Sequence, residues 1–117
     1  MLPKTIIVLA LIYFLSTGYG TEAILEMPSG TINVQTNTQK DGWRQEGIIP
    51  LSYVMAREKM RESMRRQGWK LIMDIPLAGR GHNLSMWRHR GHRVIVRLWR
   101  IDAGKTGIAW GEEHHES

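Results

Sequence analysis

The sequence predicts an α+β fold: one amphipathic helix packed on an antiparallel meander of three to four strands, after a cleaved N-terminal signal peptide. Two patterns beyond residue 47 carry this prediction. Apolar residues first recur at three- and four-residue steps, as in an amphipathic helix, and then alternate with polar residues in short runs, as in strands. Short connections make consecutive strands antiparallel neighbours, and a helix across one sheet face buries both apolar surfaces.

The first twenty residues have the three parts of a secretory signal peptide. Lys4 gives a positive lead, residues 6–15 form an unbroken apolar run, and residues 16–20 are small and polar. Cleavage after Gly20 or after Ala23 fits the small-residue pattern of a processing site. The alternative is an uncleaved membrane anchor, but a spanning helix needs about 20 apolar residues and this run has ten.

The composition indicates a small exported domain. The 117-residue chain is basic, with a net charge of +5, and contains no cysteine, so it has neither a disulfide nor a lipid-modified cysteine. The length left after cleavage suffices for one domain. We predict a signal peptide over 1–20, a polar segment over 21–47 that is partly strand or tether, an α+β domain over 48–111 and a polar tail over 112–117. The expected location is secreted or periplasmic, and the sequence does not distinguish between the two.

The helix is predicted to start near Pro50, which suits a first helical turn, and to end before Gly68. Its apolar stripe consists of Tyr53, Ala56, Met60 and Met64. The start of this stripe is expected to be widened by Leu51, Val54 and Met55. Gly68 stands where a left-handed residue closes a helix, and Trp69 can fold back on the last turn.

Strands are predicted over residues 69–75, 84–89, 93–101 and 106–110. The third is the strongest, with one face formed by Val94, Val96 and Leu98. Arg90 and Gly91 form a tight turn before it, and residues 102–105 form a second turn after it. A further short strand over 31–36 would point Ile32 and Val34 inward; the alternative is a disordered leader.

A basic, tryptophan-bearing hairpin is the candidate binding site. Arginine planes stack on tryptophan and pair with carboxylates or phosphates, so this combination suits an anionic or acidic partner. The predicted binding residues are Arg88, Arg90, Arg93, Arg97, Trp99 and Arg100. The alternative is that these arginines are only the solvated side of a sheet whose tryptophans are core.

Neither a metal nor a cofactor is expected. His89 and His92 flank a turn, but zinc sites need three or four converging ligands. The methionines that could favour copper lie mostly on the helix stripe, where methionine is an ordinary core residue. Export makes nucleic acid an unlikely partner, and a membrane is a partner only if the N-terminal segment stays uncleaved.

These observations predict an exported binding or interaction module without enzymatic activity, which turns a basic sheet face toward an anionic or acidic partner. One alternative is a small secreted hydrolase of an anionic polymer, for which the residues to test are Asp74, His89, His92 and Arg97. Another is an accessory subunit of a cell-envelope assembly, in which residues 21–47 become ordered on meeting a partner. An exposed Trp99 on a basic surface would favour binding, and an exposed carboxylate within hydrogen-bond reach of a histidine would favour the hydrolase.

Overall fold

A computed structural model of the chain describes residues 25–37, 43–77 and 81–113. The predicted signal peptide over 1–20 lies outside the described residues, as do residues 114–117 of the predicted tail. Leu25 already belongs to the buried core, and the backbone of Glu26 is held by two hydrogen bonds to the side-chain amide of Gln67. The chain therefore packs against the domain from Leu25 onward.

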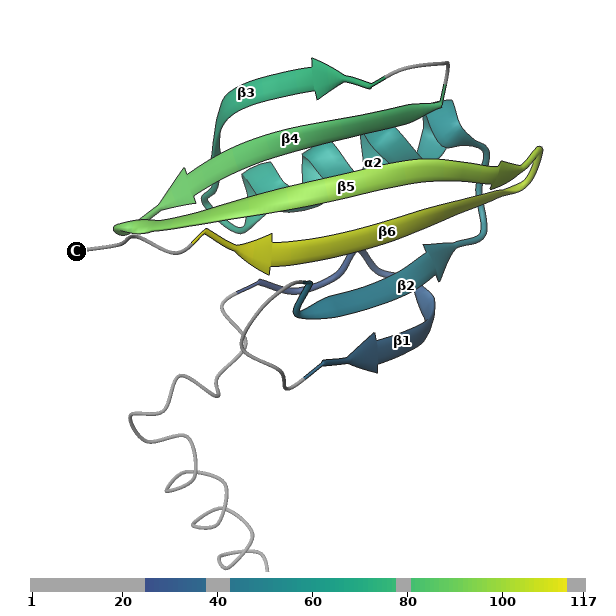
Figure 1. Ribbon diagram of the computed structural model, residues 1–117, viewed down its shortest axis with the longest axis horizontal. Coiled ribbons are helices and arrows are strands. Elements are labelled where there is room, and N and C mark those ends of the chain that lie inside the picture. Colours follow the sequence, from purple (N-terminus) through teal and green to yellow (C-terminus); the bar gives the residue numbers. More distant parts are fainter. Residues whose placement is uncertain (1–24, 38–42, 78–80, 114–117) are drawn as a thin grey trace, which may run out of the picture.

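The described residues form one helix on one face of a six-stranded antiparallel sheet, so the α+β class is confirmed (Figure 1). The elements are β1 (Ile32–Thr36), β2 (Gln45–Ile49), α2 (Tyr53–Arg66), β3 (Lys70–Pro76), β4 (His82–His89), β5 (His92–Asp102) and β6 (Lys105–Glu112). The strand order is β1-β2-β6-β5-β4-β3. The prediction of three to four strands was wrong, because β1 and β2 join the sheet as well.

The two additional strands are held by pairing between distant parts of the chain. β2 lies beside β6, with Glu46 opposite Ala109, and β1 lies outside β2 with Ile32 opposite Ile48. The predicted boundary between residues 47 and 48 falls within β2. Ile32 and Val34 do not point into the core as expected; they are 47% and 42% exposed because β1 is an edge strand.

The helix begins one turn later than predicted. Ser52 caps it, since its hydroxyl oxygen accepts a hydrogen bond from the Met55 N–H, so Pro50 precedes the helix. The stripe residues Ala56, Met60 and Met64 are buried, as predicted. Val54 and Met55 do not widen it: they are 68% and 57% exposed, because at about 100° per residue they point away from the Ala56 side.

The helix ends as the sequence predicts. Gly68 has φ +95°, its N–H donates to the Arg65 carbonyl, and the Trp69 N–H donates to the Met64 carbonyl. These two bonds form a Schellman motif, in which the left-handed glycine reverses the chain. Trp69 is 3% exposed and belongs to the core, so the turn leads directly into β3.

The sheet buries the face that carries Val94, Val96 and Leu98, as predicted, together with Ile108 and Trp110 of β6. Apart from Trp69, the apolar residues of the strand predicted over 69–75 remain outside this core. Leu71, Met73 and Ile75 are 39–45% exposed because β3 is the other edge of the sheet and the register shifts between Leu71 and Met73. In the β4–β5 turn, Arg90 and Gly91 both have positive φ, as a two-residue hairpin turn requires.

Candidate binding face

The register divides the sheet into two faces. Directly paired residues of neighbouring strands share a face, so the core residues of β5 define the helix side and the remaining residues of β5 define the other. The open face is defined here as the side with Ile95, Arg97 and Trp99 of β5 together with the residues paired to them. Figure 1 is viewed onto this side, with α2 behind the sheet. Among the described elements no helix covers the open face.

A row of three cations crosses one end of the open face. Lys70 of β3 is paired with Arg88 of β4, and Arg88 is paired with Arg93 of β5. Like charges directly opposite one another destabilise a sheet. Arg93 has an ion pair with Glu113 at 3.5 Å, whereas Lys70 and Arg88 have none within the described residues. This row therefore concentrates positive charge at the end of the sheet where the β4–β5 turn lies.

The middle of the open face is apolar apart from Arg97 and Glu46. The next row along the strands consists of Met73, Met86, Ile95 and Gly111. The row after it consists of Ile75, Leu84, Arg97, Ala109 and Glu46. Arg97 thus stands well inside the sheet, with Leu84 and Ala109 as its direct partners on the two neighbouring strands.

Arg97 is held in place by Trp99 and His82. Its guanidinium carbon lies 4.7 Å from the centroid of the Trp99 ring, which is a cation–π contact. Its Nε–H donates a hydrogen bond of 3.0 Å to Nε2 of His82, the residue paired with Trp99. No described residue hydrogen-bonds the two Nη groups of Arg97. An oriented guanidinium with two free nitrogens is suited to a bidentate carboxylate or phosphate.

Trp99 itself lies flat across β6. It is paired with Gly107, and a Cβ placed on Gly107 would overlap the Trp99 ring, so only glycine lets the indole rest on the strand. The ring is half-buried. Beside it lies a pocket of about 510 Å³, whose apolar lining includes Val34, Ile48, Trp99 and Ile101.

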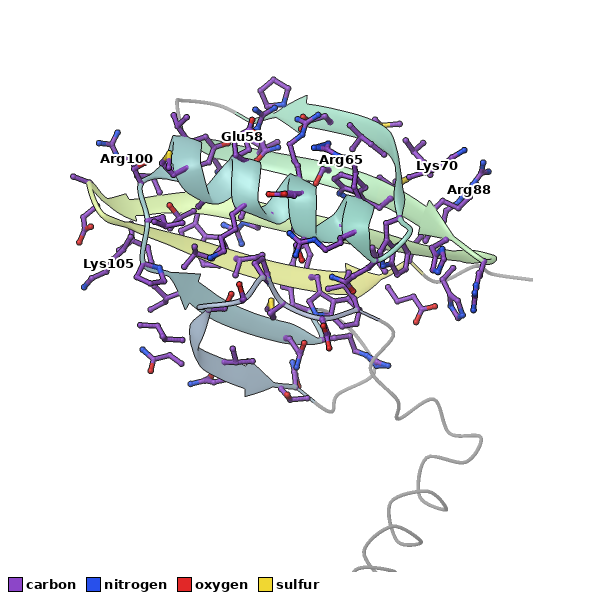
Figure 2. The ribbon with its side chains drawn as sticks, turned by 180° about the vertical axis from the view of Figure 1, so that it is seen from behind. Glu58, Arg65, Lys70, Arg88, Arg100 and Lys105 are labelled. Atoms are coloured by element: carbon purple, nitrogen blue, oxygen red, sulfur yellow. The ribbon has the colours of Figure 1, made fainter. Side chains whose placement is uncertain are left out.

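The six predicted binding residues do not form one patch. Arg88, Arg93, Arg97 and Trp99 share the open face, and Arg90 lies in the β4–β5 turn at its edge. Arg100 pairs with Thr106, which faces the helix side, and it lies at the opposite end of the molecule from Arg88 (Figure 2). Trp87, from the same hairpin, is 1% exposed and packs in the core.

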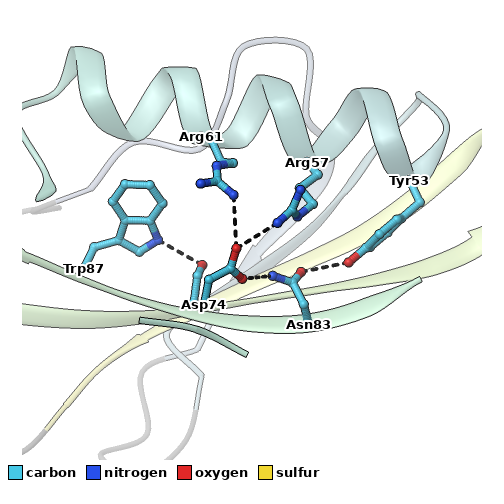
Figure 3. A network of polar contacts seen from close by, with 7 residues as sticks. Tyr53, Arg57, Arg61, Asp74, Asn83 and Trp87 are labelled. Carbon is cyan, nitrogen blue, oxygen red and sulfur yellow. Dashed lines mark hydrogen bonds and ion pairs between the residues drawn. The ribbon is translucent and has the colours of Figure 1, made fainter. Parts of the chain in front are cut away.

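A partly buried polar network connects the helix to the sheet on the other face (Figure 3). Asp74 accepts hydrogen bonds from Arg57 at 2.8 Å, from Arg61 at 3.0 Å and from the Asn83 amide at 2.6 Å. Tyr53 donates to the Asn83 carbonyl at 2.9 Å. Burial raises the pKa of Tyr53 above its usual 10.0, Arg57 lowers it, and Asp74 raises it. With both carboxylate oxygens occupied, Asp74 is a structural anchor, which the sequence pattern did not reveal.

His89 and His92 are paired across the β4–β5 turn, whereas His82 lies at the other end of β4. The His89 ring lies 5.2 Å from the Trp69 ring, and His92 Nδ1 lies 2.8 Å from a carboxylate oxygen of Glu112. The His92–Glu112 pair is exposed and joins β5 to β6 at the end of the sheet that holds the cation row. Among the described residues, no three histidine, aspartate or glutamate side chains lie together as metal ligands.

No protein-family model, curated protein or solved structure matches the chain. Within the described part, no helix has the length and apolar character needed to cross a membrane. The function is therefore inferred from the sequence and from the geometry of the sheet.

Proposed function

We propose that the protein is an exported binding module without enzymatic activity, and that it receives an anionic or acidic partner on the open face. The supporting observation is the cation row of Lys70, Arg88 and Arg93, which shares its face with Arg97. Three cations side by side repel one another in the free protein. A partner that brings negative charge relieves this repulsion as it binds.

Export is the second part of the proposal. The N-terminal pattern and the absence of cysteine support cleavage after Gly20 or Ala23 and a location in the periplasm or outside the cell. The mass and N-terminal sequence of the protein recovered from fractionated cells test this directly. Recovery of the intact chain from membranes, with Met1 to Gly20 still attached, would contradict it.

Binding to poly-L-glutamate tests the open face. Arg88→Gln combined with Arg93→Gln should weaken binding by about tenfold or more, since hydrogen bonds to charged groups contribute about 1.5–3 kcal/mol each before solvent screening. The matched control, Arg65→Gln with Arg66→Gln on the exposed side of α2, removes the same charge from the other face. Equal loss in both double variants would mean that only net charge matters, and the open face would then have no specific role.

One observation favours the hydrolase as a second candidate. The exposed contact between His92 and Glu112 places a carboxylate on a histidine, an arrangement that can activate a water molecule as a general base. Of the residues named for this alternative, Asp74 is occupied by two arginines. Arg97 lies on the open face, whereas His92 and Glu112 lie on the helix side of the sheet. Cleavage of an anionic polymer that disappears in both His92→Ala and Glu112→Gln would establish the hydrolase in place of the binding module.

A further inference from the structure

The open face has the composition of a surface that another layer covers. An antiparallel sheet with one solvated face carries polar residues on that face. Here the two middle rows are apolar except for Arg97 and Glu46, and Met73 and Ile75 at the β3 edge are 45% and 42% exposed. The sheet is therefore patterned for burial on both faces, although the described residues supply a helix on only one.

Small residues of β6 lie between two pockets on this face. Ala109 and Gly111 have small side chains or none, and the Trp99 ring covers Gly107 beyond them. A pocket of about 510 Å³ lies at the Trp99 end, and another of about 280 Å³, lined by Ile95 and Trp43, lies at the Gly111 end. A helix that follows β6 would rest on Ala109 and Gly111 and place side chains at both pockets.

The charges on the open face argue against a second copy of the chain as the occupant. Four cations, Lys70, Arg88, Arg93 and Arg97, stand against two carboxylates, Glu46 and Glu113. Two such faces packed together would bring like charges into a desolvated interface, which is costly.

The position of Arg97 argues against a lipid surface. Its guanidinium lies in the centre of the apolar rows, with both Nη groups free among the described residues. Charged groups are expensive to bury in hydrocarbon. A polypeptide carboxylate, in contrast, can satisfy both nitrogens at once while apolar residues around it cover the sheet.

The spacing of the cations predicts the spacing of the partner's acids. Arg97 lies four residues from Arg93 on one strand, which at about 3.3 Å per residue is about 13 Å. On a helix that rises 1.5 Å per residue, two carboxylates seven residues apart are separated by about 10.5 Å, and the long arginine side chains can cover the remaining difference. Seven residues also return to within about 20° of the same side of the helix, so both acids face the sheet together with the apolar stripe.

From these observations we infer that the open face is the docking site for an amphipathic helix of a partner protein, with an apolar stripe along β6, one carboxylate on Arg97 and another on the cation row. This inference rests on the proposed binding function and specifies the partner's chemistry. The helix would complete a three-layer arrangement in which the sheet is covered on both sides.

Three synthetic helical peptides of equal length test the docked helix by titration calorimetry with the full mature chain. The first has a leucine stripe and, on the same side of the helix, two glutamates seven residues apart. The second peptide has glutamine in place of both glutamates. The third has the amino acids of the first, but its leucines are distributed around the helix. We expect the first to bind and each of the others to bind at least about tenfold more weakly.

Matched variants test whether Arg97 contacts a carboxylate of the peptide. Arg97→Gln should remove the preference for the glutamate peptide over the glutamine peptide, whereas Arg65→Gln on the exposed side of α2 should preserve it. Both variants replace a surface arginine, and unchanged circular dichroism establishes that each is folded. Preserved preference in Arg97→Gln would overturn the assignment of a carboxylate to this arginine.

The outcomes also separate this inference from the proposed function. Equal binding of the striped and redistributed peptides, with poly-L-glutamate still bound, would overturn the docked helix and leave the anionic binding function intact. Absence of binding to every acidic probe would overturn both. Concentration-dependent dimers in sedimentation, or tighter binding to phosphatidylglycerol vesicles than to the striped peptide, would overturn the helix in favour of a second copy or a membrane.

Discussion

The guanidinium of Arg97 lies over the ring of Trp99, 4.7 Å from its centroid, and the ring in turn lies over Gly107. Backbone, indole and guanidinium thus form a stack that starts at a glycine on β6 and ends in a charged group presented on the open face. The absence of a side chain at Gly107 of β6 therefore determines where the Trp99 ring lies, and the ring supports the Arg97 guanidinium on β5.

Gly107→Ala should disturb this stack. The new Cβ would overlap the Trp99 ring, so the indole must leave β6 and Arg97 loses its support. Overpacking of this kind costs about 1–3 kcal/mol. Urea unfolding should show this loss for Gly107→Ala and not for the control Gly104→Ala, where a Cβ meets nothing within 4 Å. Adding Trp99→Ala to Gly107→Ala should remove most of the penalty for the extra methyl group, and full additivity of the two changes would contradict the stack.

Asp74→Ala should weaken the attachment of α2 to the sheet. The change leaves Arg57 and Arg61 close together without their carboxylate and leaves the Asn83 amide without an acceptor. A loss of about 1–3 kcal/mol in the free energy of unfolding is expected, because all three donors are partly or fully buried. Glu62→Ala breaks an exposed pair with Arg66 and should cost about 0.5 kcal/mol or less. Similar losses in the two variants would show that the Asp74 network has no special role.

The titration of Tyr53 offers a direct view of the same network. Burial and the nearby Asp74 raise the pKa of Tyr53 against the opposing effect of Arg57, so the folded chain favours the neutral phenol. The stability from this shift is fully present below the usual pKa of 10.0 and is lost as the pH rises through the higher folded-state pKa. Tyr13 and Tyr19 precede both predicted cleavage sites, so a chain that begins at Thr21 or Ile24 contains Tyr53 as its one tyrosine. The tyrosinate absorbance of the mature chain should therefore have a higher midpoint in buffer than in urea. An equal midpoint would contradict the buried environment.

The sequence was sufficient for the local elements. The spacing of Ala56, Met60 and Met64, the glycine at position 68 and the alternation in β5 each act within a few residues, and each has the predicted effect in the structure. The sequence did not predict which distant segments pair as neighbouring strands. Nothing local in residues 45–49 indicates that they lie beside β6, because that register depends on contacts some sixty residues away. β2 was missed for this reason, and the short strand predicted over 31–36, which corresponds to β1, was not expected to extend the same sheet.

The same holds for the candidate site, where features local to one strand were predicted and contacts between strands were not. Sequence alternation placed Arg97 and Trp99 on one face of their strand, which the structure confirms, but it could not reveal that Lys70 completes a row with Arg88 and Arg93. Arg100 was grouped with the others because it is close in sequence, although the strand's alternation turns it to the helix side. The His82 contact with Arg97 likewise depends on the register of β4 against β5.

The open face as the binding surface is tested most directly by the indole N–H signals of the mature protein in heteronuclear NMR, with the striped glutamate peptide added. The Trp99 indole lies on that face beside Arg97, whereas the Trp87 and Trp110 indoles are held on the helix side by hydrogen bonds to Ser85 and Gln45. We expect the Trp99 signal and the Arg97 Nε–H signal to move with peptide concentration while those of Trp87 and Trp110 stay in place. Binding that leaves the Trp99 signal unmoved, or moves the helix-side indoles in its place, would contradict the account.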